Sequence, residues 1–511
     1  MKNRRSNGMI LKVIFSTAVI IISAADYSAS AVTKKTFDFI IGVDGDFKAA
    51  AAAATQNASS GKRFNLFFPK GEYNIGKLTG DANQMTSFTA SNVSFIGENA
   101  DSTIIFNQSI NEGISITSTL YFNKANNLYL QDLSILNKAN YRNGSDLSKT
   151  GRHVAVKEQG DKLIYKNVKL LSTQDTYYTV GTRTYWEDGE IHGTVDFICG
   201  YGDVFFNKCI LYLERDKGCL TAPGTKSSWG YVFMNCIIDG VGSNHLLGRS
   251  WNNTPRCVYI NTIMKKLPTT AAWGDPMNVL PALFAEYNSK TATGSSVDLS
   301  GRRTTYSLDG ATVRLNPVLS TSQAAQYTIS NVLKGNDNWQ PDNLTKQVSA
   351  PVVRLEGKTL KWNDNDSVLC WVVYKNRKYF KCVASNNLEI TPDATVTYYV
   401  RAANSMGGLG PTSNVVDGIT TSVNHTTSDF SNTNTRFFFD SARKTFYVQN
   451  VTQACNVHIY SLSGKLLRSR AFQVNSTKLP HEISMTGFNQ GVYIYKVEYA
   501  GCINSGEIQL L

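Results

Sequence analysis

The chain has 511 residues, of which 42% are hydrophobic and 18% charged, and its formal net charge is +12. This length exceeds one ordinary core and predicts two or three domains. The basic balance favours a polyanionic partner such as nucleic acid, an acidic polysaccharide or an anionic surface, but clustered Lys and Arg runs and RNP-type segments are missing, so we expect no nucleic-acid binding.

The N-terminal residues are expected to be a targeting signal. Cations at positions 2, 4 and 5 precede the apolar stretch from Met9 to Ala25, and Ala29-Ser-Ala31 has the small-x-small form of a cleavage site. We predict a signal peptide over 1–31, cleaved near Ala31, and therefore a secreted or cell-surface protein. A membrane anchor is the alternative, which the short apolar core disfavours. Cleavage removes four cations and one acid, so the charge falls from +12 to +9.

A polar-turn pattern recurs six times after the signal. Each copy is an apolar residue, any residue, Asn or Asp, two further residues and a second apolar residue; the copies centre on Asp132, Asn167, Asp188, Asn207, Asn235 and Asn261. Intervals of 19 to 35 residues suit a solenoid whose coils bury inward side chains against one another. We predict a parallel β-helix over 32–345, with an antiparallel sandwich as the alternative, and a helix over Ala49–Ala54 that caps its N-terminal end.

Two aspartates, Asp175 and Asp196, are 21 residues apart, which is about one coil of such a solenoid. Strands on successive coils lie about 4.8 Å apart. The two carboxyl groups would therefore lie side by side, closer than two ionised acids tolerate, and one would keep its proton. A protonated acid beside a carboxylate nucleophile predicts a hydrolase.

The nine cysteines are an odd number, which leaves at least one thiol without an intramolecular partner. Their spacing indicates no metal site. Cys209 and Cys236 follow repeat asparagines and are expected to pack inside the solenoid as small hydrophobic residues. Two pairs could form disulfides in C-terminal domains: Cys370 with Cys382, and Cys455 with Cys502.

The sequence pattern changes after about Asn343. Short alternating strands between Pro351 and Val416 have the spacing of a β-sandwich. The stretch from Tyr398 to Asn404 resembles the penultimate strand of a fibronectin type III domain. We predict such a domain over 349–417 and a linker rich in Thr, Ser and Asn over 418–436.

A second small β-sandwich is predicted over 437–511. Val457-His-Ile-Tyr-Ser-Leu-Ser-Gly464 and Gly491-Val-Tyr-Ile-Tyr-Lys496 resemble the C-terminal sorting domain of the type IX secretion system of Bacteroidetes. The resemblance implies outer-membrane secretion machinery as a partner. Sorting domains usually end in a basic tail, whereas this chain ends in Gly506-Glu-Ile-Gln-Leu-Leu511, and a β-sandwich without a sorting role is the alternative.

Three blocks in the middle of the chain resemble the pectinesterase family. They are Gln174-Asp-Thr176, Gly193-Thr-Val-Asp-Phe-Ile198 and Leu247-Gly-Arg-Ser-Trp251, in the family's order, and the resemblance covers most of residues 37–305. It implies a right-handed parallel β-helix with methylated homogalacturonan, or pectin, as its substrate. The whole chain is then all-β, with the β-helix followed by two small β-sandwiches.

The resemblance also implies a role for each matched polar residue. Asp196 attacks the C6 carbonyl of a methylated galacturonate, while Asp175 protonates the departing methanol and later accepts a proton from water. Gln174 donates its amide to the oxyanion, and Arg249 pairs with Asp196. His192 stands where the family generally has Glu and is expected to be a polar packing residue.

Candidate substrate-binding residues follow from the same resemblance, and so do several departures. Arg152 stands where the family has an upstream glutamine that contributes to the oxyanion hole. Cys199 replaces an aromatic residue and Ser250 a proline, and both changes are expected in the substrate cleft. The aromatic residues expected to stack on sugar rings are Trp251, Tyr178, Phe197 and Trp273.

We therefore predict a monomeric carboxylic ester hydrolase that removes methyl esters from pectin without a metal or other cofactor, releasing methanol and pectate. The alternatives are a pectin lyase or acetylesterase on the same fold, and a non-catalytic protein that binds acidic polysaccharides. A lyase would need a calcium cluster, for which only Asp203 and Glu190 are expected near the aspartate pair. A serine esterase is disfavoured because the chain has no Gly-x-Ser-x-Gly motif.

Overall fold

The computed structural model describes residues 32–78, 85–139 and 151–419, and in the last domain 436–440, 444–449, 454–462, 464–473, 481–499 and 502–510. The predicted signal peptide over 1–31 and nearly all of the predicted linker over 418–436 lie outside these residues. Within them, no helix has the length and apolar character needed to span a membrane.

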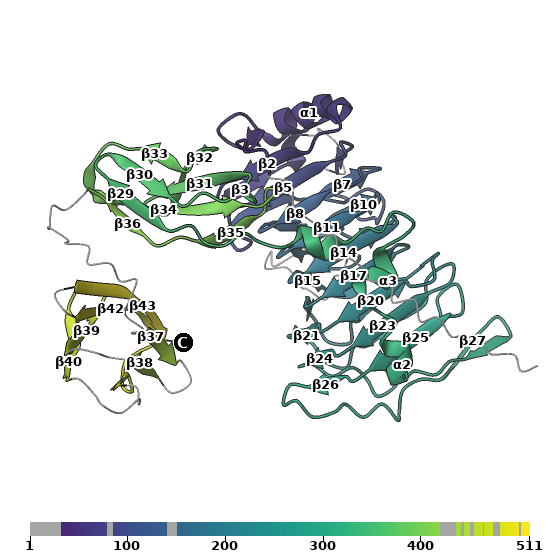
Figure 1. Cartoon of the computed structure of the whole chain (residues 1–511). Helices are drawn as coiled ribbons and strands as arrows, with labels where there is room; N and C mark the ends of the chain where they lie inside the picture. The colour runs from purple at the N-terminus through teal and green to yellow at the C-terminus, as the bar shows by residue number, and fades with distance from the viewer. Residues whose placement is uncertain are drawn as a thin grey trace, which may run out of the picture. The chain divides into compact units, whose positions relative to one another are not determined.

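A parallel β-helix runs from Phe39 to Thr291 and forms the purple-to-teal column of Figure 1. Each complete coil adds one strand to each of three sheets, the terminal coils contribute fewer, and the strands of all three sheets pair in parallel. The prediction of a β-helix is confirmed, and the antiparallel alternative is wrong here. The ten-stranded sheet contains β1 (Phe39–Ile40), β2 (Phe64–Phe68), β5 (Val93–Gly97), β8 (Tyr129–Gln131), β11 (Leu163–Lys166), β14 (Arg183–Glu187), β17 (Asp203–Asn207), β20 (Tyr231–Met234), β23 (Arg256–Ile260) and β25 (Leu283–Tyr287).

The other two sheets complete each coil. The seven-stranded sheet contains β4 (Thr86–Phe88), β7 (Leu120–Asn123), β10 (Val156–Gln159), β13 (Tyr177–Thr179), β16 (Val195–Gly200), β19 (Cys219–Pro223) and β22 (Leu246–Gly248). The nine-stranded sheet contains β3 (Gly71–Asn74), β6 (Thr103–Asn107), β9 (Ser134–Asn137), β12 (Lys169–Leu171), β15 (Glu190–Gly193), β18 (Ile210–Leu213), β21 (Ile237–Gly240), β24 (Ile263–Met264) and β26 (Lys290–Thr291).

The polar residue of the repeat turns the chain between two of these sheets. At five of the six predicted centres it adopts a left-handed backbone, with φ between 49° and 57°, a conformation that Asn and Asp tolerate better than most residues. The centre at Asn207 is wrong by one residue. Asn207 pairs in register with Glu187 and Met234, and Lys208 takes the left-handed turn with φ 56°. The repeat pattern fits two registers here, because Phe205 and Ile210 have the same spacing as Phe206 and Leu211. Only Phe206 and Leu211 face the core of the column.

Side chains inside the column stack coil upon coil. Tyr165 lies on Trp186 with ring centroids 4.1 Å apart, and Phe206 lies on Phe233 at 4.4 Å. Cys209 and Cys236 are free thiols buried in the same core, as predicted. Each added coil therefore buries its aromatic residues against the previous coil, which fixes the register between coils.

The helix α1 (Phe47–Asn57) covers the N-terminal end of the column (Figure 1). The side chain of Asp46 caps it by accepting the backbone N–H of Ala49 at 2.9 Å. Phe47, Ala50 and Ala54 pack into the first coils. The predicted cap over Ala49–Ala54 is confirmed, and the helix extends beyond it at both ends.

Later parts of the chain cover the outer face of the ten-stranded sheet. The hairpin β27 (Thr305–Leu308) and β28 (Ala311–Arg314) precedes three short helices, α2 (Thr321–Ala324), α3 (Ile329–Leu333) and α4 (Pro341–Leu344). Of these, α3 packs against β14 and β17.

An antiparallel sandwich follows. One sheet contains β29 (Val353–Glu356), β30 (Thr359–Trp362) and β33 (Asn387–Glu389); the other contains β31 (Cys370–Lys375), β32 (Lys378–Val383), β34 (Asp393–Ala403), β35 (Leu409–Thr412) and β36 (Val416–Gly418). Cys370 and Cys382 are buried free thiols here rather than a disulfide.

This sandwich is docked on the first coils of the β-helix. Arg401 reaches the carboxylate of Asp132 at 3.2 Å and the carbonyl of Glu98 at 2.7 Å. The amide of Gln131 donates to the carbonyl of Leu409 at 3.0 Å. Apolar side chains of both parts form one buried cluster, so the sandwich and the β-helix share a core.

The last described strands form a separate compact unit. One sheet contains β37 (Arg436–Asp440), β38 (Thr445–Gln449) and β41 (His481–Ser484); the other contains β39 (Cys455–Ser461), β40 (Leu466–Phe472), β42 (Gly491–Tyr499) and β43 (Cys502–Leu510). Cys455 is a buried free thiol, whereas the side chain of Cys502, its proposed disulfide partner, lies outside the described residues.

Candidate active site

The coil register brings Asp175 and Asp196 together on the seven-stranded sheet. Tyr177 of β13 pairs with Ile198 of β16, an offset of 21 residues that also stacks the two aspartates. Both have left-handed backbones, with φ 59° at Asp175 and 51° at Asp196. Both side chains are 5% exposed. The sequence spacing thus predicted their stacking correctly.

Asp196 is held by Arg249, which directly follows β22. The Nε of Arg249 donates to Oδ1 of Asp196 at 3.0 Å, and Nη2 donates to Oδ2 at 2.5 Å. A guanidinium that binds both carboxylate oxygens fixes the plane of the carboxylate. Asp196 is therefore an oriented carboxylate, as the sequence predicted.

Asp175 has a different environment. Its burial, together with the neighbouring charge of Asp196, raises the pKa of Asp175 from 3.8 to about 7. The thiol of Cys199 interacts with the Asp175 carboxyl group, and burial raises the pKa of that thiol well above its ordinary value. The site thus holds one paired carboxylate and one carboxyl group that carries a proton near neutral pH.

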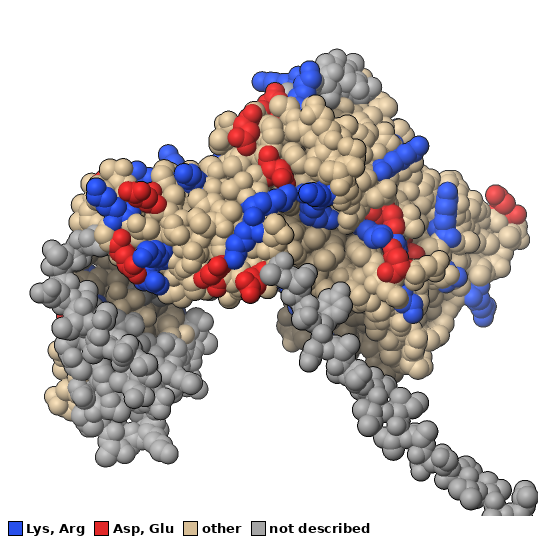
Figure 2. Space-filling view, turned by 45° about the horizontal axis from the view of Figure 1, so that its top comes forward, with Lys and Arg blue, Asp and Glu red and all other residues tan. Residues whose placement is uncertain are grey.

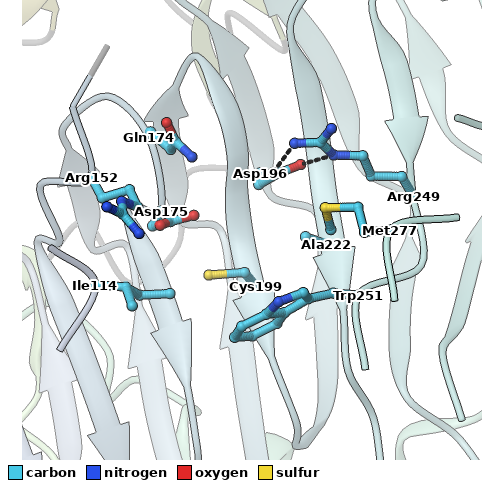
Figure 3. Close-up of a pocket in the computed structure, with 10 residues that line it drawn as sticks. All are labelled: Ile114, Arg152, Gln174, Asp175, Asp196, Cys199, Ala222, Arg249, Trp251 and Met277. Atoms are coloured by element: carbon cyan, nitrogen blue, oxygen red, sulfur yellow. Dashed lines mark hydrogen bonds and ion pairs between the residues drawn. The ribbon is translucent and has the colours of Figure 1, made fainter. Parts of the chain in front are cut away.

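A pocket of about 210 Å³ opens onto both carboxyl groups (Figure 3). Its polar side is formed by Arg152, Gln174, Asp175, Asp196 and Arg249; its apolar side is formed by Ile114, Cys199, Ala222, Trp251 and Met277. Polar groups that converge above an apolar floor are typical of a site that orients a polar reacting group and packs its less polar substituents.

Gln174 and Arg152 lie on neighbouring coils at the polar side. Their backbones form an isolated parallel bridge, and both side chains line the pocket beside Asp175 (Figure 3). The Nε of Arg152 also bonds Glu112 at 2.5 Å, in a half-exposed ion pair. Arg152 therefore stands at the pocket, where the sequence placed it, and brings a positive charge to it.

Two of the four predicted sugar-stacking residues lie at the site. Trp251 lines the pocket, and Tyr178 contacts its ring with centroids 6.1 Å apart. The sequence reasoning missed Tyr201, whose ring stacks on Trp251 at 5.6 Å and 10°. Tyr201 follows the Gly193–Ile198 block by three residues, and this proximity could have indicated that it lies at the site.

The other two predictions are wrong. Phe197 is fully buried in the core of the column, because the left-handed Asp196 and a register shift between Val195 and Ile198 interrupt the strand alternation there, whereas Cys199 lines the pocket. Trp273 is 1% exposed and stacks on Phe284 inside the last coils at 4.6 Å. Ser250 is also buried, and its hydroxyl donates to the carbonyl of Val279, so the expected change in the cleft holds for Cys199 but not for Ser250.

His192 does not enter the pocket. Its Nδ1 lies 2.6 Å from Glu214 and its Nε2 lies 2.5 Å from Glu190. Burial alone would lower the pKa of His192, but the hydrogen bonds to these two glutamates raise it overall. His192 is a buried polar packing residue of the nine-stranded sheet, as the sequence indicated.

Three residues of the apolar side, Ile114, Ala222 and Met277, were not found from the sequence. Each comes from a different loop or strand, and none belongs to a motif. Only the fold brings them together. In the part of the chain that the structure describes, no group of three or more His, Cys, Asp or Glu could hold a metal ion.

Residues 38–336 match the family model described as Pectinesterase. The chain belongs to the pectinesterase family. Among similar proteins, Pectinesterase 2 of Citrus sinensis is 26% identical over 311 residues, which is 57% of this chain and 55% of that protein. Pectinesterase 31 of Arabidopsis thaliana is 34% identical over 146 residues, 27% of this chain and 46% of that protein. The first curated relatives are matched over about a quarter to just over half of their length.

A solved structure supports the fold of this pectinesterase-family chain. Pectin methylesterase from carrot aligns with a TM-score of 0.50 at 21% identity, over 63% of this chain and 99% of that one. Pectin methylesterase PemA from Erwinia chrysanthemi aligns with a TM-score of 0.47 at 26% identity, over 60% of this chain and 99% of that one.

Residues 442–503 match a second model, described as Secretion system C-terminal sorting domain. The predicted resemblance of the last domain to a C-terminal sorting domain is therefore confirmed. A domain of this kind marks a secreted or cell-surface protein.

Proposed function

We propose that this protein is a pectin methylesterase, which hydrolyses the C6 methyl esters of galacturonate units and releases methanol and pectate. The observation that carries this proposal is the unequal pair of stacked carboxyl groups. Asp196 is paired with Arg249 and ready to attack, while the pKa of Asp175 is raised to about 7, so Asp175 can deliver a proton. Neither the formation nor the hydrolysis of an acyl group on Asp196 requires a metal.

In the first half of the reaction, a carboxylate oxygen of Asp196 forms a bond to the C6 carbonyl carbon. The carbonyl oxygen becomes an oxyanion that accepts hydrogen bonds from the amide of Gln174, and Arg152 adds a positive charge on the same side. The C6–methoxyl bond then breaks, and Asp175 gives its proton to the departing methoxide. The products are methanol and an acyl group on Asp196.

In the second half, Asp175 is an ionised carboxylate and takes a proton from water. The resulting hydroxide attacks the acyl carbon and displaces Asp196, which restores both carboxyl groups to their starting states. Arg249 stabilises Asp196 as a leaving group because both of its N–H groups already face the carboxylate oxygens.

The sugar chain is proposed to lie along the outer face of the seven-stranded sheet, with Trp251 and Tyr178 under sugar rings and Tyr201 behind Trp251. Basic and acidic side chains are interspersed on the face drawn in Figure 2.

The remaining proposals concern the chain as a whole. We propose a monomer in which residues 32–345 carry the reaction, 349–417 form a docked sandwich, and 437–511 serve the secretion machinery of the outer membrane. The signal peptide is proposed to be cleaved near Ala31. The basic charge that remains suits an anionic polymer.

The decisive experiment measures methanol released from highly methylated pectin in the presence of EDTA, by the mature protein and by Asp196→Asn. Asparagine keeps the size of the side chain and tolerates the left-handed backbone. The matched control is Asp188→Asn, which changes the same atoms at a repeat turn with the same handedness. We expect full release by the parent and the control, and none by Asp196→Asn.

The competing functions give different products. A lyase would produce an unsaturated, ultraviolet-absorbing product and lose activity in EDTA, and an acetylesterase would release acetate from acetylated pectin. Equal methanol release by Asp196→Asn and the parent would refute the assignment of the nucleophile. Absence of methanol with any pectin sample would refute the proposed reaction.

A further inference from the structure

A second cleft lies between the first coils of the β-helix and the docked sandwich. Its volume is about 530 Å³. One wall comes from the loop after β1 and from the segment between β2 and β3, and the other comes from the turn between β31 and β32 and the start of β32. Its lining residues are Ile41, Gly42, Val43, Pro69, Lys70, Tyr73, Glu98, Arg377, Lys378 and Tyr379.

The geometry of the cleft is fixed by the docking of the sandwich. The ring of Tyr379 packs on Phe67 of β2, with centroids 5.4 Å apart. The turn between β31 and β32 has two successive left-handed residues, Asn376 with φ 48° and Arg377 with φ 63°, which is the geometry of a tight type I′ hairpin turn. Arg377 and Lys378 of this turn line the cleft together with Lys70.

The three cations of the cleft, Lys70, Arg377 and Lys378, are exposed. Among the ion pairs of the described residues, none involves any of them. The nearby Glu98 is 8% exposed, and its carboxylate accepts the backbone N–H of Lys70 at 2.8 Å. Burial raises the pKa of Glu98, and the three cations outnumber this single acid in the lining of the cleft. The cleft is thus positively charged.

Two half-exposed tyrosines, Tyr73 and Tyr379, lie between these charges. The hydroxyl of Tyr73 donates to the carbonyl of Pro69 at 2.6 Å, which fixes its ring at the edge of the cleft. Aromatic rings supply flat surfaces for sugar rings, and the three ammonium and guanidinium groups supply partners for carboxylates. A nucleic acid would need a longer basic track than the three cations of this cleft.

We propose that this cleft binds a linear saccharide whose successive sugars carry free carboxylates, namely a de-esterified stretch of galacturonan. The anionic saccharide class follows from the cleft itself, whereas the choice of galacturonate rests on the proposed function, whose product it would be. The cleft lies at the first coils and the esterase pocket at the fourth and fifth, on a different sheet. It is therefore a second site that retains the enzyme on polymer already de-esterified.

The test compares a triple variant of the cleft with a matched control. The cleft variant is Lys70→Ala, Arg377→Asn and Lys378→Ala, where asparagine preserves the left-handed turn. The control is Arg314→Asn, Lys334→Ala and Lys358→Ala, three exposed cations away from both sites. Binding of fully de-esterified galacturonate oligomers is measured by calorimetry on the full-length protein, so that one or two binding sites can be counted.

We expect the parent and the control to bind two oligomers, and the cleft variant to bind one, with affinity for polygalacturonate reduced about tenfold, as suits the loss of three exposed charge pairs. Methanol release from a short methylated oligomer should be unchanged in all three. Unchanged binding by the cleft variant would overturn the proposal. An equal loss of binding to sulfated dextran would also overturn it, because the cleft would then recognise any polyanion.

The outcome does not depend on esterase activity. If the protein releases no methanol but the cleft variant still loses one galacturonate site, the proposed function fails and the binding site stands. If methanol is released and both variants bind galacturonate alike, the proposed function stands and the proposed binding site fails.

Discussion

Replacement of Asp175 by asparagine should stabilise the folded protein in neutral and alkaline solution while abolishing turnover. The pKa of Asp175 is about 7 because burial and the charge of Asp196 disfavour its ionised form, whereas the same carboxyl group titrates near 3.8 when unfolded. Below the lower value both states are protonated and Asp175 costs nothing. Between the two values folding takes up a proton, so stability falls as the pH rises, and the full cost persists above pH 7.

The size of this cost follows from the two pKa values. A difference of about 3 between 7 and 3.8 corresponds to about 4 kcal/mol, an upper limit because the buried pair relaxes when it ionises. Asparagine has no proton to gain or lose, retains the shape of the side chain and tolerates the left-handed backbone at this position. Its turnover should fall about a hundredfold or more, since the general acid is gone.

The assay is urea unfolding followed by tryptophan fluorescence at about pH 3 and about pH 8, since these lie on either side of the titration window. Asp175→Asn should shift the midpoint upward at the higher pH and little at the lower one. Asp101→Asn, whose carboxylate is 75% exposed, serves as the control and should change neither midpoint appreciably. A variant that is no more stable than the parent at the higher pH would refute the proton assignment of the carboxyl pair.

Three further perturbations have defined outcomes. Arg249→Met leaves Asp196 without its cation and should lower kcat/KM on methylated pectin about a hundredfold or more. His192→Gln should reduce stability most at acid pH, because the raised pKa of His192 gives a contribution that is complete below 6.5 and lost as the pH rises through the folded-state value. Arg302→Met leaves Glu286 as a buried charge without its 2.6 Å partner and should destabilise the fold by about 3–5 kcal/mol.

Each of these has a contradicting result, and Arg249→Met also has a matched control. Arg249→Lys keeps the positive charge and should lose less activity than Arg249→Met. Equal loss in the two variants would mean that the charge beside Asp196 contributes nothing and that only the paired N–H groups of the guanidinium matter. A cost of His192→Gln that is the same at acid and alkaline pH would contradict a protonated His192. Full stability of Arg302→Met in urea unfolding would contradict the buried pair.

The sequence could predict those parts of the site that follow from coil length. Asp175 and Asp196 stack because 21 residues make one coil, and the polar turn residues carry left-handed backbone that Asn and Asp favour. These are local or periodic properties. The error at Asn207 shows their limit, since a pattern of apolar neighbours fits two registers and only pairing between coils decides between Asn207 and Lys208.

Inward and outward orientation was harder to predict. Phe197 and Cys199 are two residues apart on β16 and would share one face of a regular strand. The register shift between Val195 and Ile198 instead places the ring of Phe197 in the core, while Cys199 lines the pocket. Trp273 is buried because the interior of the column is filled by stacked aromatic residues. Met277 and Ile114 reach the pocket only through the folded path of distant loops, a tertiary property that no motif reports.

The docking of the sandwich has a consequence for the order in which the chain folds. The contact between Asp132 and Arg401 joins residues that are 269 positions apart. Contacts of such long sequence separation form late, since a large loop must close before they are made. During synthesis, the apolar outer side chains of the first coils therefore remain exposed to solvent until the sandwich has been made. A chain truncated before β31 would keep this apolar surface exposed and would be prone to aggregate.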